Sequence, residues 1–361
     1  MSVHRQNRRI IVAMSGGIDS SMAAYLLKQT GYEPLGVTFR FWSFQGKQQT
    51  DALIAQAEEV ARQLNITHQT VAIEKEFEEV VVRQFVTEYL QGVTPNPCVL
   101  CNRLIKWRHL RQIAKEMHAS YVATGHYAKI EKSRDNSRYQ ILRGVDQTKD
   151  QSYVLWQLSQ SALSKTVLPL GSMQKSEVRK IAIELGLPIA ESRESQDICF
   201  LPDHNYRDFL RQYVPEKIAA IGRGELLDES GKVLGFHSGF HNFTVGQRKG
   251  FRMGFEQRKY VKQIRAKKNQ VVIANGERLF STGMLVRDLN WVSEPSQTVL
   301  EGLVQIRYNH RPVHCQAEMV DQGRMRIKFA QKQRAVTPGQ SAVLYQDNRL
   351  IFGGIIQESL N

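Results

Sequence analysis

The chain is predicted to be an α/β protein with a parallel sheet, followed by a small central domain and a C-terminal β-barrel. Over roughly the first 200 residues, apolar runs of strand length alternate with helical patterns, which is typical of a parallel sheet with right-handed crossovers. Beyond about Asn205 the pattern changes to short alternating runs, glycine-rich turns and many β-branched residues. A chain of 361 residues exceeds one usual core. We therefore expect three domains, at residues 1–205, 206–278 and 279–361.

The first element is a strand over Ile10–Met14, which breaks into Ser15-Gly16-Gly17 before the helical pattern Met22–Leu27. Adjacent glycines let the backbone approach a ligand while N–H groups gather at the start of a helix, which suits a phosphate. No lysine follows, as it would in the loop of kinases and GTPases, and Asp19 takes its place. We expect Asp19 to orient Mg²⁺ or the first helical turn at the pyrophosphate of a nucleotide; the alternative is that Asp19 or Ser20 merely caps a helix.

The next elements alternate in the same way. Ligands of such sheets gather at the carboxyl ends of the strands, where the glycine turn lies. The predicted strands are Glu33–Phe39, His68–Ile73 and Tyr121–Thr124, and the predicted helices are Asp51–Leu64, Phe77–Gln91, a helix from near Cys101 toward Met117, and Ser176–Leu185 with Ser176 as its cap. The first domain is expected to end soon after Pro202.

Three of the four cysteines lie in the predicted first domain. Cys98-x-x-Cys101 follows two prolines that argue against regular structure, and a thiol at a helix start is expected to have a lowered pKa. This pair alone is compatible with a redox pair, half a zinc site or two packed thiols; zinc needs four ligands, and no second pair of this kind is present. Cys199 adds a third thiol in a polar loop. Cys315, in a strand-like run, reads as a structural thiol.

The second half reads as strands of small sheets or a barrel. The predicted strands are Val271–Ala274, Leu303–Arg307, Met325–Phe329 and Ser341–Tyr345. Between the domains, Gly235–Gly254 interleaves aromatic residues with bases and glycines. Such a stretch can hold an RNA strand or be a solvated loop, and the loop is the interpretation we favour from the sequence.

The charge balance favours a polyanionic partner. Lys and Arg number 49 against 35 Asp and Glu, which gives a net charge of +14. The N-terminal residues do not resemble a secretory signal, and no window approaches the roughly 18 to 20 apolar residues of a membrane span. We expect a cytoplasmic protein with reduced cysteines and no membrane partner.

The stretch Ala13–Ser20 resembles the signature of the PP-loop ATP pyrophosphatases, which cleave ATP between its α- and β-phosphates. Over essentially its whole length the chain resembles the tRNA-specific 2-thiouridylases, which replace oxygen 2 of the wobble uridine by sulfur. The resemblance rests on Ser15–Ser20, Thr94–Asn102, Ala123–Tyr127, Lys149–Tyr153, Ser195–Phe200, Val245–Gly250 and Thr337–Ala342.

The resemblance implies roles for particular residues. Asp19 and the nucleophile Cys101 would be catalytic, with Cys199 as persulfide carrier. The implied ATP contacts are Ala13, Met14, Ser15, Gly16, Gly17, Ile18, Asp19, Ser20, Phe39 and Gly125. The implied tRNA contacts are Asn96, Pro97, Cys98, His126, Lys149, Asp150, Gln151, Arg307, Tyr308 and Gln340. ATP, Mg²⁺, a tRNA with a wobble uridine, and a sulfur donor, either a cysteine desulfurase or a relay protein, would be required.

Two positions depart from the commonest family pattern. Phe39 stands where the family commonly has a methionine that lines the adenine-binding site, and Cys98 stands where it commonly has an aspartate. Because Cys98 supplies a third thiol, the sequence favours a 4Fe–4S cluster on Cys98, Cys101 and Cys199, with persulfide transfer as the alternative. Two further functions remain open: a PP-loop ligase or amidotransferase that activates a small carboxylate, and a non-catalytic iron–sulfur RNA-binding protein.

Overall fold

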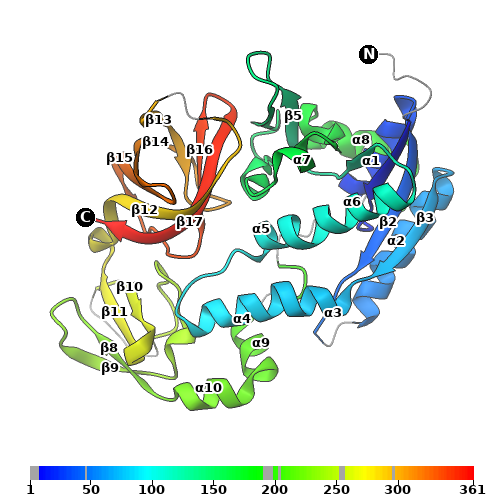
Figure 1. Ribbon diagram of the computed structural model, residues 1–361. Helices are drawn as coiled ribbons and strands as arrows, with labels where there is room; N and C mark the ends of the chain where they lie inside the picture. The colour runs from blue at the N-terminus through cyan, green and yellow to red at the C-terminus, as the bar shows by residue number, and fades with distance from the viewer. Residues whose placement is uncertain (1–7, 45–46, 190–197, 202–204, 252–256, 295–296) are drawn as a thin grey trace. The chain divides into compact units, whose positions relative to one another are not determined.

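The computed structural model divides the chain into two compact units (Figure 1). The first unit comprises Met1–Val81, Cys98–Pro202 and Asn348–Leu350; the second comprises Val82–Pro97, Asp203–Asp347 and Ile351–Asn361. The structure describes residues 8–44, 47–189, 198–201, 205–251, 257–294 and 297–361. The predicted boundary after Pro202, and Ser195–Asp197 of one motif, lie outside these residues. No helix among them is long and apolar enough to cross a membrane.

The first unit is built on a five-stranded parallel sheet, as the sequence predicts. Its strands are β1 (Arg9–Ala13), β2 (Glu33–Arg40), β3 (Thr67–Ala72), β4 (Tyr121–Ala123) and β7 (Thr166–Val167), in the order β3-β2-β1-β4-β7. The central strand β1 is continuously apolar because both faces of the sheet are covered. Its residues Ile10, Ile11 and Val12 are fully buried, which contributes about 1.5–3 kcal/mol for each side chain.

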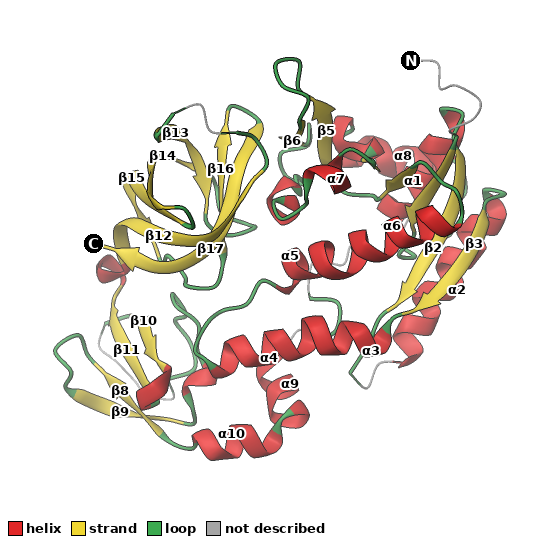
Figure 2. Ribbon diagram, viewed as in Figure 1, coloured by secondary structure: helices red, strands yellow, loops and turns green. Residues whose placement is uncertain are grey.

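Helices cover this sheet (Figure 2). The longer ones are α1 (Ile18–Gln29), α2 (Lys47–Gln63), α6 (Trp107–Glu116) and α8 (Lys175–Glu184). Helix α1 packs against β2 and α8, and α6 packs against β1 and β4. The unit also holds the hairpin β5 (Ala128–Lys132) and β6 (Tyr139–Arg143), and the short α7 (Gln160–Leu163). One core joins Met14, Met22, Val60 and Val178 from different elements.

Three helix predictions differ from the structure. The predicted Phe77–Gln91 helix runs as α3 (Glu74–Phe77), a π-helical turn and α4 (Arg83–Leu90). The helix expected near Cys101 begins earlier, as α5 (Pro97–Cys101), because a proline fits the first turn, where its missing N–H is not needed. A π-helix, Asn102–Lys106, then leads into α6. The N-cap of α8 is Gln174 rather than Ser176.

The second unit contains a small sheet with two helices. Its helices are α9 (Tyr206–Tyr213) and α10 (Pro215–Ile221), and its strands are β8 (Gly224–Leu227), β9 (Val233–His237), β10 (Lys259–Arg265) and β11 (Gln270–Asn275), in the order β10-β11-β8-β9. Only β11 and β8 are parallel neighbours. Tyr89 of α4 stacks on Tyr206 of α9 with ring centroids 4.3 Å apart, so α4 belongs to this unit.

The predicted C-terminal barrel is confirmed. Six strands, β12 (Phe280–Trp291), β13 (Val299–Gln305), β14 (Val313–Asp321), β15 (Arg324–Arg334), β16 (Ser341–Gln346) and β17 (Arg349–Leu360), pair in the order β12-β15-β14-β13-β16-β17, and β17 pairs back to β12. Along β15 exposed and buried residues alternate, as a barrel wall requires. Cys315 is buried in this core, as expected for a structural thiol.

A buried histidine of the second unit predicts pH-dependent stability. Asn242 Nδ2 donates to His241 Nε2 at 3.0 Å, and His241 Nδ1 has no partner in the described part of the chain. Burial, and secondarily His237 and Arg211, lowers the pKa of His241 to about 4. The unfolded chain takes up this proton near pH 6.5, so between about pH 6.5 and 4 it binds more protons than the folded chain, and stability falls as pH falls.

We expect the free energy of unfolding to drop by about 1–2 kcal/mol across this window. His241→Gln should flatten the pH dependence, whereas His314→Gln, at an exposed position of β14, should not. Urea denaturation followed by circular dichroism between pH 4.5 and 7 measures both. An unchanged pH profile for His241→Gln would contradict the argument.

Candidate active site

The glycine turn follows β1 at the carboxyl edge of the parallel sheet. Gly16 has φ of +78°, and a Cβ built there would lie 2.3 Å from the Leu53 carbonyl oxygen of α2. No other residue fits this position without moving α2. Met14 N–H donates to the Val37 carbonyl at 2.8 Å, which fixes the start of the turn against β2.

The N-terminus of α1 faces this turn with its backbone donors uncapped. Gly17 is the N-cap, and no described side chain caps the helix. Ser20 Oγ instead accepts from Ser15 N–H at 3.0 Å and donates to the Gly17 carbonyl at 3.0 Å, so it holds the turn in shape. The first N–H groups of a helix have no partner within the helix, and the positive end of the helix dipole lies there. This geometry suits an anion.

Asp19 is paired with a lysine from a distant part of the chain. Lys175 Nζ lies 2.6 and 2.7 Å from the two Asp19 carboxylate oxygens, and Tyr127 Oη donates to the same carboxylate at 2.8 Å. The Lys175 side chain is only 9% exposed. In the structure Asp19 holds a buried ammonium group beside the uncapped helix end; its predicted role in orienting Mg²⁺ or the helical turn stays a prediction.

Asp146 fixes the start of α8, from which Lys175 extends. Its Oδ2 accepts from Lys175 N–H at 3.0 Å, and Thr148 donates to Oδ1 through both its N–H and its hydroxyl. Burial alone would raise the pKa of Asp146, but the donors from Thr148 and the backbone together lower it. Sequence reasoning missed Lys175, Asp146 and the role of Tyr127, because only the fold brings these residues to Asp19.

Gly125 lies where the strand order reverses, between β1 and β4. A Cβ at Gly125 would come within 2.6 Å of the Asp19 carbonyl carbon and 2.7 Å of Ser20 N. The absence of a side chain therefore lets the loop after β4 contact the start of α1. Crevices at such reversal points are the usual ligand sites of open parallel sheets. The implied ATP contacts Ala13 to Ser20 and Gly125 thus share one edge of the sheet.

Phe39, the other implied ATP contact, lies at the end of β2 on the same edge. Its ring is buried, with centroids 5.9 Å from Phe41 and 5.9 Å from His109. Phe41 in turn contacts Phe77, and Phe77 contacts Phe200, next to Cys199. Aromatic packing thus links the end of β2 to the cysteine segment. An apolar wall of this kind suits a purine ring.

The three cysteines of the first unit differ in accessibility. Cys98 and Cys199 are exposed, and Cys101 is buried. Burial raises the pKa of the Cys101 thiol to about 12, although Lys106 acts in the opposite direction. The lowered pKa expected from a helix start is therefore wrong for Cys101, because desolvation of the thiolate outweighs the helix dipole.

Lys106 interacts electrostatically with all three thiols. Burial alone would lower its pKa, but Cys101, Cys98 and Cys199 together raise it. The π-helix Asn102–Lys106 explains this geometry, since a wider turn places residues five apart on nearly the same face, whereas an α-helix would separate them. Sequence reasoning missed Lys106 because the π-turn leaves no clear sequence signal.

The residues that the structure describes contain no preassembled group of metal ligands for the predicted Mg²⁺ or 4Fe–4S cluster. Among these residues, no three His, Cys, Asp or Glu side chains are grouped to hold a metal ion. Both Asp19 oxygens are already engaged by Lys175. The Mg²⁺ role of Asp19 and the 4Fe–4S cluster on Cys98, Cys101 and Cys199 therefore both stay predictions.

The implied tRNA contacts of the first unit are largely fixed by internal hydrogen bonds. Thr124 Oγ1 lies 2.7 Å from His126 Nδ1, and burial together with the charge of Lys106 lowers the pKa of His126 to about 3. Asp150 Oδ1 accepts from Gly144 N–H, and Gln151 Oε1 accepts from Tyr127 N–H, both at 3.0 Å. Asp150 and Gln151 thus support the loop that carries Lys149.

The implied tRNA contacts of the second unit also hold its loops in place. Gln340 Nε2 donates to the Pro95 carbonyl at 2.9 Å, which anchors the chain that carries Asn96 and Pro97. Arg307 donates to the Ala335 carbonyl and to Thr337 Oγ1. Tyr308 is 40% exposed.

Three family profiles match consecutive parts of the chain. They are described as a tRNA methyl transferase HUP domain at residues 8–203, a tRNA methyl transferase PRC-barrel domain at residues 207–275 and an aminomethyltransferase beta-barrel domain at residues 281–356. A solved 4-thiouridine synthetase in complex with RNA and ATP matches 58% of this chain and 51% of that chain, at 19% identity and a TM-score of 0.36.

Curated relatives match over full length. The tRNA-specific 2-thiouridylase MnmA of Geotalea uraniireducens is 39% identical over 100% of this chain and 98% of the relative. The tRNA-specific 2-thiouridylase MnmA 2 of Thermoanaerobacter sp. is 40% identical over 98% of this chain and 99% of the relative. Identity at this level across both whole chains shows that the chain belongs to the tRNA-specific 2-thiouridylase family.

Proposed function

We propose that this chain uses ATP to replace oxygen 2 of a tRNA wobble uridine by sulfur. The observation that carries the proposal is the ion pair of the buried Lys175 with Asp19 beside the uncapped start of α1, in a chain that matches 2-thiouridylases end to end. The Lys175 ammonium, which Asp19 holds in place, and the positive end of the helix would stabilise negative charge where a pyrophosphate group leaves. The exposed Cys199 and the buried Cys101 supply thiols of two kinds in the same unit.

The first step activates the base. Oxygen 2 of the uracil attacks the α-phosphorus of ATP, the bond to the β-phosphate oxygen breaks, and pyrophosphate leaves with the electron pair. The α1 N–H groups and the Lys175 ammonium stabilise the charge that develops on the leaving group. Asp19 and Tyr127 hold Lys175 in place, so little reorganisation is needed as this charge forms. Mg²⁺ bound to the ATP phosphates would add further positive charge.

The second step transfers sulfur. A donor, a cysteine desulfurase or a relay protein, loads the exposed Cys199 with a persulfide. The terminal sulfur attacks carbon 2, and AMP leaves with oxygen 2. The Cys101 thiolate then attacks Cys199 Sγ, which forms a Cys101–Cys199 disulfide and releases the thiouridine. An external dithiol returns the disulfide to two thiols. The cationic Lys106 faces both cysteines and stabilises each thiolate as it forms.

The rival functions make different use of these residues. A ligase for small carboxylates has no need of three thiols in the first unit, and an iron–sulfur RNA-binding protein has no need of the Lys175–Asp19 pair. A 4Fe–4S route through Cys98, Cys101 and Cys199 is the alternative for the sulfur step, and we derive no step through it because no such ligand group is preformed.

The test is a reconstituted reaction. Purified protein, unmodified tRNA transcript, ATP, Mg²⁺ and a persulfide or sulfide donor are expected to yield 2-thiouridine at the wobble position, with one AMP for each sulfur inserted. Nucleoside mass spectrometry and phosphate chromatography measure the two products. ADP in place of AMP would contradict the activation step, and AMP without thiouridine would favour the ligase.

A further inference from the structure

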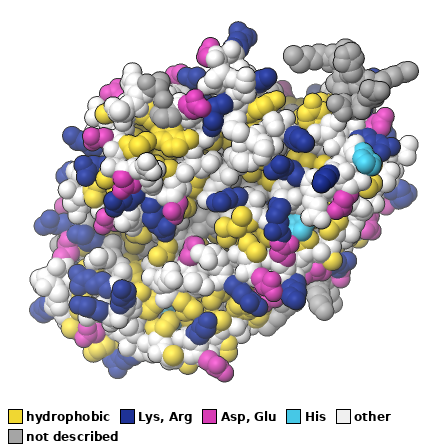
Figure 3. Space-filling model, in the orientation of Figure 1, with side chains coloured by type: hydrophobic (Ala, Val, Ile, Leu, Met, Phe, Trp, Pro, Cys, Tyr) yellow, Lys and Arg dark blue, Asp and Glu magenta, His cyan; other side chains and the backbone are white. Residues whose placement is uncertain are grey.

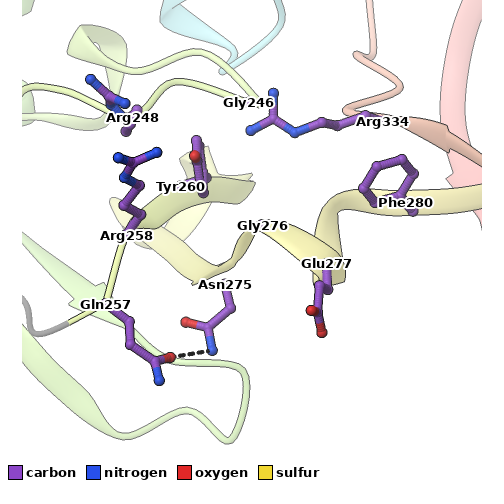
Figure 4. A pocket seen from close by; sticks show the side chains of 10 residues that line it. All are labelled: Gly246, Arg248, Gln257, Arg258, Tyr260, Asn275, Gly276, Glu277, Phe280 and Arg334. Carbon is purple, nitrogen blue, oxygen red and sulfur yellow. Dashed lines mark hydrogen bonds between the residues drawn. The ribbon is translucent and has the colours of Figure 1, made fainter.

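The second unit contains an arginine-lined hollow of about 880 Å³ (Figure 4). Arg248 and Arg258 line it from the segment before β10, with Arg258 directly preceding the strand, and Arg334 lines it from the end of β15. We propose that this hollow binds the sugar–phosphate backbone of tRNA at an unpaired nucleotide, whose base stacks on Phe280. The inference rests on the proposed function. It assigns to the second unit a binding site for a part of the tRNA that is distinct from the target base.

The hollow is cationic, and its three arginine side chains are exposed and form no ion pairs with described carboxylates. Glu277 is the one acid in the described lining. Lys and Arg side chains also gather over the small sheet formed by β8 to β11, on the face of the molecule drawn in Figure 3. Three guanidinium groups around one hollow match phosphate oxygens, which accept two parallel hydrogen bonds from each fork.

The loop that carries Arg248 is anchored to β10 by backbone hydrogen bonds. Gly246 N–H donates to the Val261 carbonyl at 2.8 Å, and Val261 N–H donates to the Gln247 carbonyl at 2.9 Å, so the loop is paired to β10. Gly246 has φ of +88°, and a Cβ there would lie 2.8 Å from Ala335 Cβ. The loop therefore packs directly beside Arg334. Arg248 and its two following residues are exposed in this loop, as the sequence predicts for a solvated stretch, while the backbone before them is anchored.

The arginine on β15 is fixed from two sides. Its guanidinium carbon lies 4.5 Å from the centroid of the Tyr260 ring, a cation–π contact. The next residue, Ala335, has φ of +55°, and Arg307 donates to its carbonyl. Arg307, an implied tRNA contact, thus also supports the backbone that presents Arg334. Preorganised charges lose less conformational entropy on binding.

Phe280 distinguishes a nucleic-acid site from a simple anion site. It pairs across β12 and β15 with Arg334, it lines the same hollow, and it is 42% exposed overall. A large exposed aromatic ring beside phosphate-binding arginines is the pattern of proteins that stack unpaired bases. The hollow also exceeds the need of a lone phosphate, since sites of 300–1,000 Å³ usually accommodate whole small ligands. Free pyrophosphate, a product of the proposed reaction, is the competing occupant.

The main test compares two triple variants of the full chain that lose the same charge. Arg248→Ala/Arg258→Ala/Arg334→Ala removes the hollow's arginines, and Arg326→Ala/Lys328→Ala/Lys332→Ala removes exposed bases elsewhere on β15. We expect the arginine triple variant to bind tRNA about 30-fold or more weakly near physiological salt. The slope of the logarithm of its binding constant against the logarithm of the salt concentration should become shallower by about 2. The control should change affinity less than about threefold. Fluorescence anisotropy with labelled tRNA across a salt series measures both.

Phe280→Ala separates stacking from charge. It should weaken tRNA binding about fivefold or more with an unchanged salt slope. The arginine variant should raise the KM for tRNA but leave the thiolation rate at saturating tRNA unchanged, which also shows that it is folded. Equal tRNA binding by the arginine triple and the control would overturn the proposal. The proposal would also be overturned if calorimetry shows that the arginine triple variant loses pyrophosphate binding while its tRNA affinity equals that of wild type. If the wild type makes no thiouridine yet the arginine triple still loses tRNA affinity, the proposed function fails and the RNA site stands.

Discussion

Replacing Asp19 by Asn is expected to lower ATP cleavage to AMP and pyrophosphate by about 10²- to 10³-fold, while tRNA affinity stays within about twofold of wild type. Asparagine keeps the shape of the side chain but not its charge. The Lys175 ammonium then loses both of its carboxylate contacts at 2.6 and 2.7 Å in a place where it is only 9% exposed. It can no longer be held toward the leaving pyrophosphate. Quenched-flow detection of AMP, with tRNA in excess, measures the effect.

A double-variant cycle separates this role from stability. Removing one partner of a buried pair leaves the other uncompensated, so Asp19→Asn is also expected to lower thermal stability. Asp19→Asn/Lys175→Gln removes both charges and should recover stability, but it should not recover AMP formation. If the double variant recovers both, the pair is structural, and the activation step must draw its positive charge from elsewhere.

The same pair marks where sequence reasoning reaches its limit. Asp19 is readable because its neighbours in the chain form the site: the apolar strand, the glycines and the helix start are local features. Lys175 lies 156 residues away, and nothing in its local pattern distinguishes it from a surface lysine at a helix start. Only the crossover order of the parallel sheet, which brings α8 beside α1, gives Lys175 a carboxylate partner.

The fold shows the same division between local and long-range signals. Strands β1 to β4 of the first unit were predictable to within one residue, because apolar runs bounded by polar turns leave few alternatives, whereas β5, β6 and β7 were not predicted. The π-turns in Glu78–Val82 and Asn102–Lys106 were not, since they change hydrogen-bond partners without changing the apolar pattern. Nor was the grouping of Val82–Pro97 with the second unit, which depends on the packing of Tyr89 against Tyr206.

The thiols illustrate how burial can reverse a local rule. A cysteine near a helix start favours the thiolate through the helix dipole. Cys101 is 6% exposed, and this burial raises its pKa to about 12 instead. A buried thiol of this kind is protected from solvent oxidants until a disulfide partner forms beside it. That property suits the resolving thiol of the persulfide route better than the thiol that first accepts sulfur.

Substitution of the three thiols is therefore expected to divide them by role. Cys199→Ser and Cys101→Ser should each reduce tRNA thiolation by at least about 10³-fold, since no other described thiol can replace a covalent sulfur carrier or its resolving partner. Pyrophosphate release in a single turnover should stay within about threefold of wild type, because the activation step uses the α1 end and Lys175 and precedes the attack of sulfur. Cys98→Ala should thiolate within about threefold of wild type if the persulfide route operates.

Cys98→Ala also decides between the two sulfur routes. A cluster with three protein ligands loses one of them in this variant, so its thiolation would fall as steeply as that of Cys101→Ser, and only in iron-reconstituted protein. Single-turnover assays on anaerobically prepared protein, with and without iron, and with sulfide or a persulfide donor, distinguish these outcomes. Trapping adds an independent readout: Cys101→Ser should accumulate tRNA linked through Cys199, because the thiol that would release it is missing. Failure to trap this adduct in the presence of AMP release would exclude Cys199 as the sulfur carrier and leave the cluster as the source of sulfur.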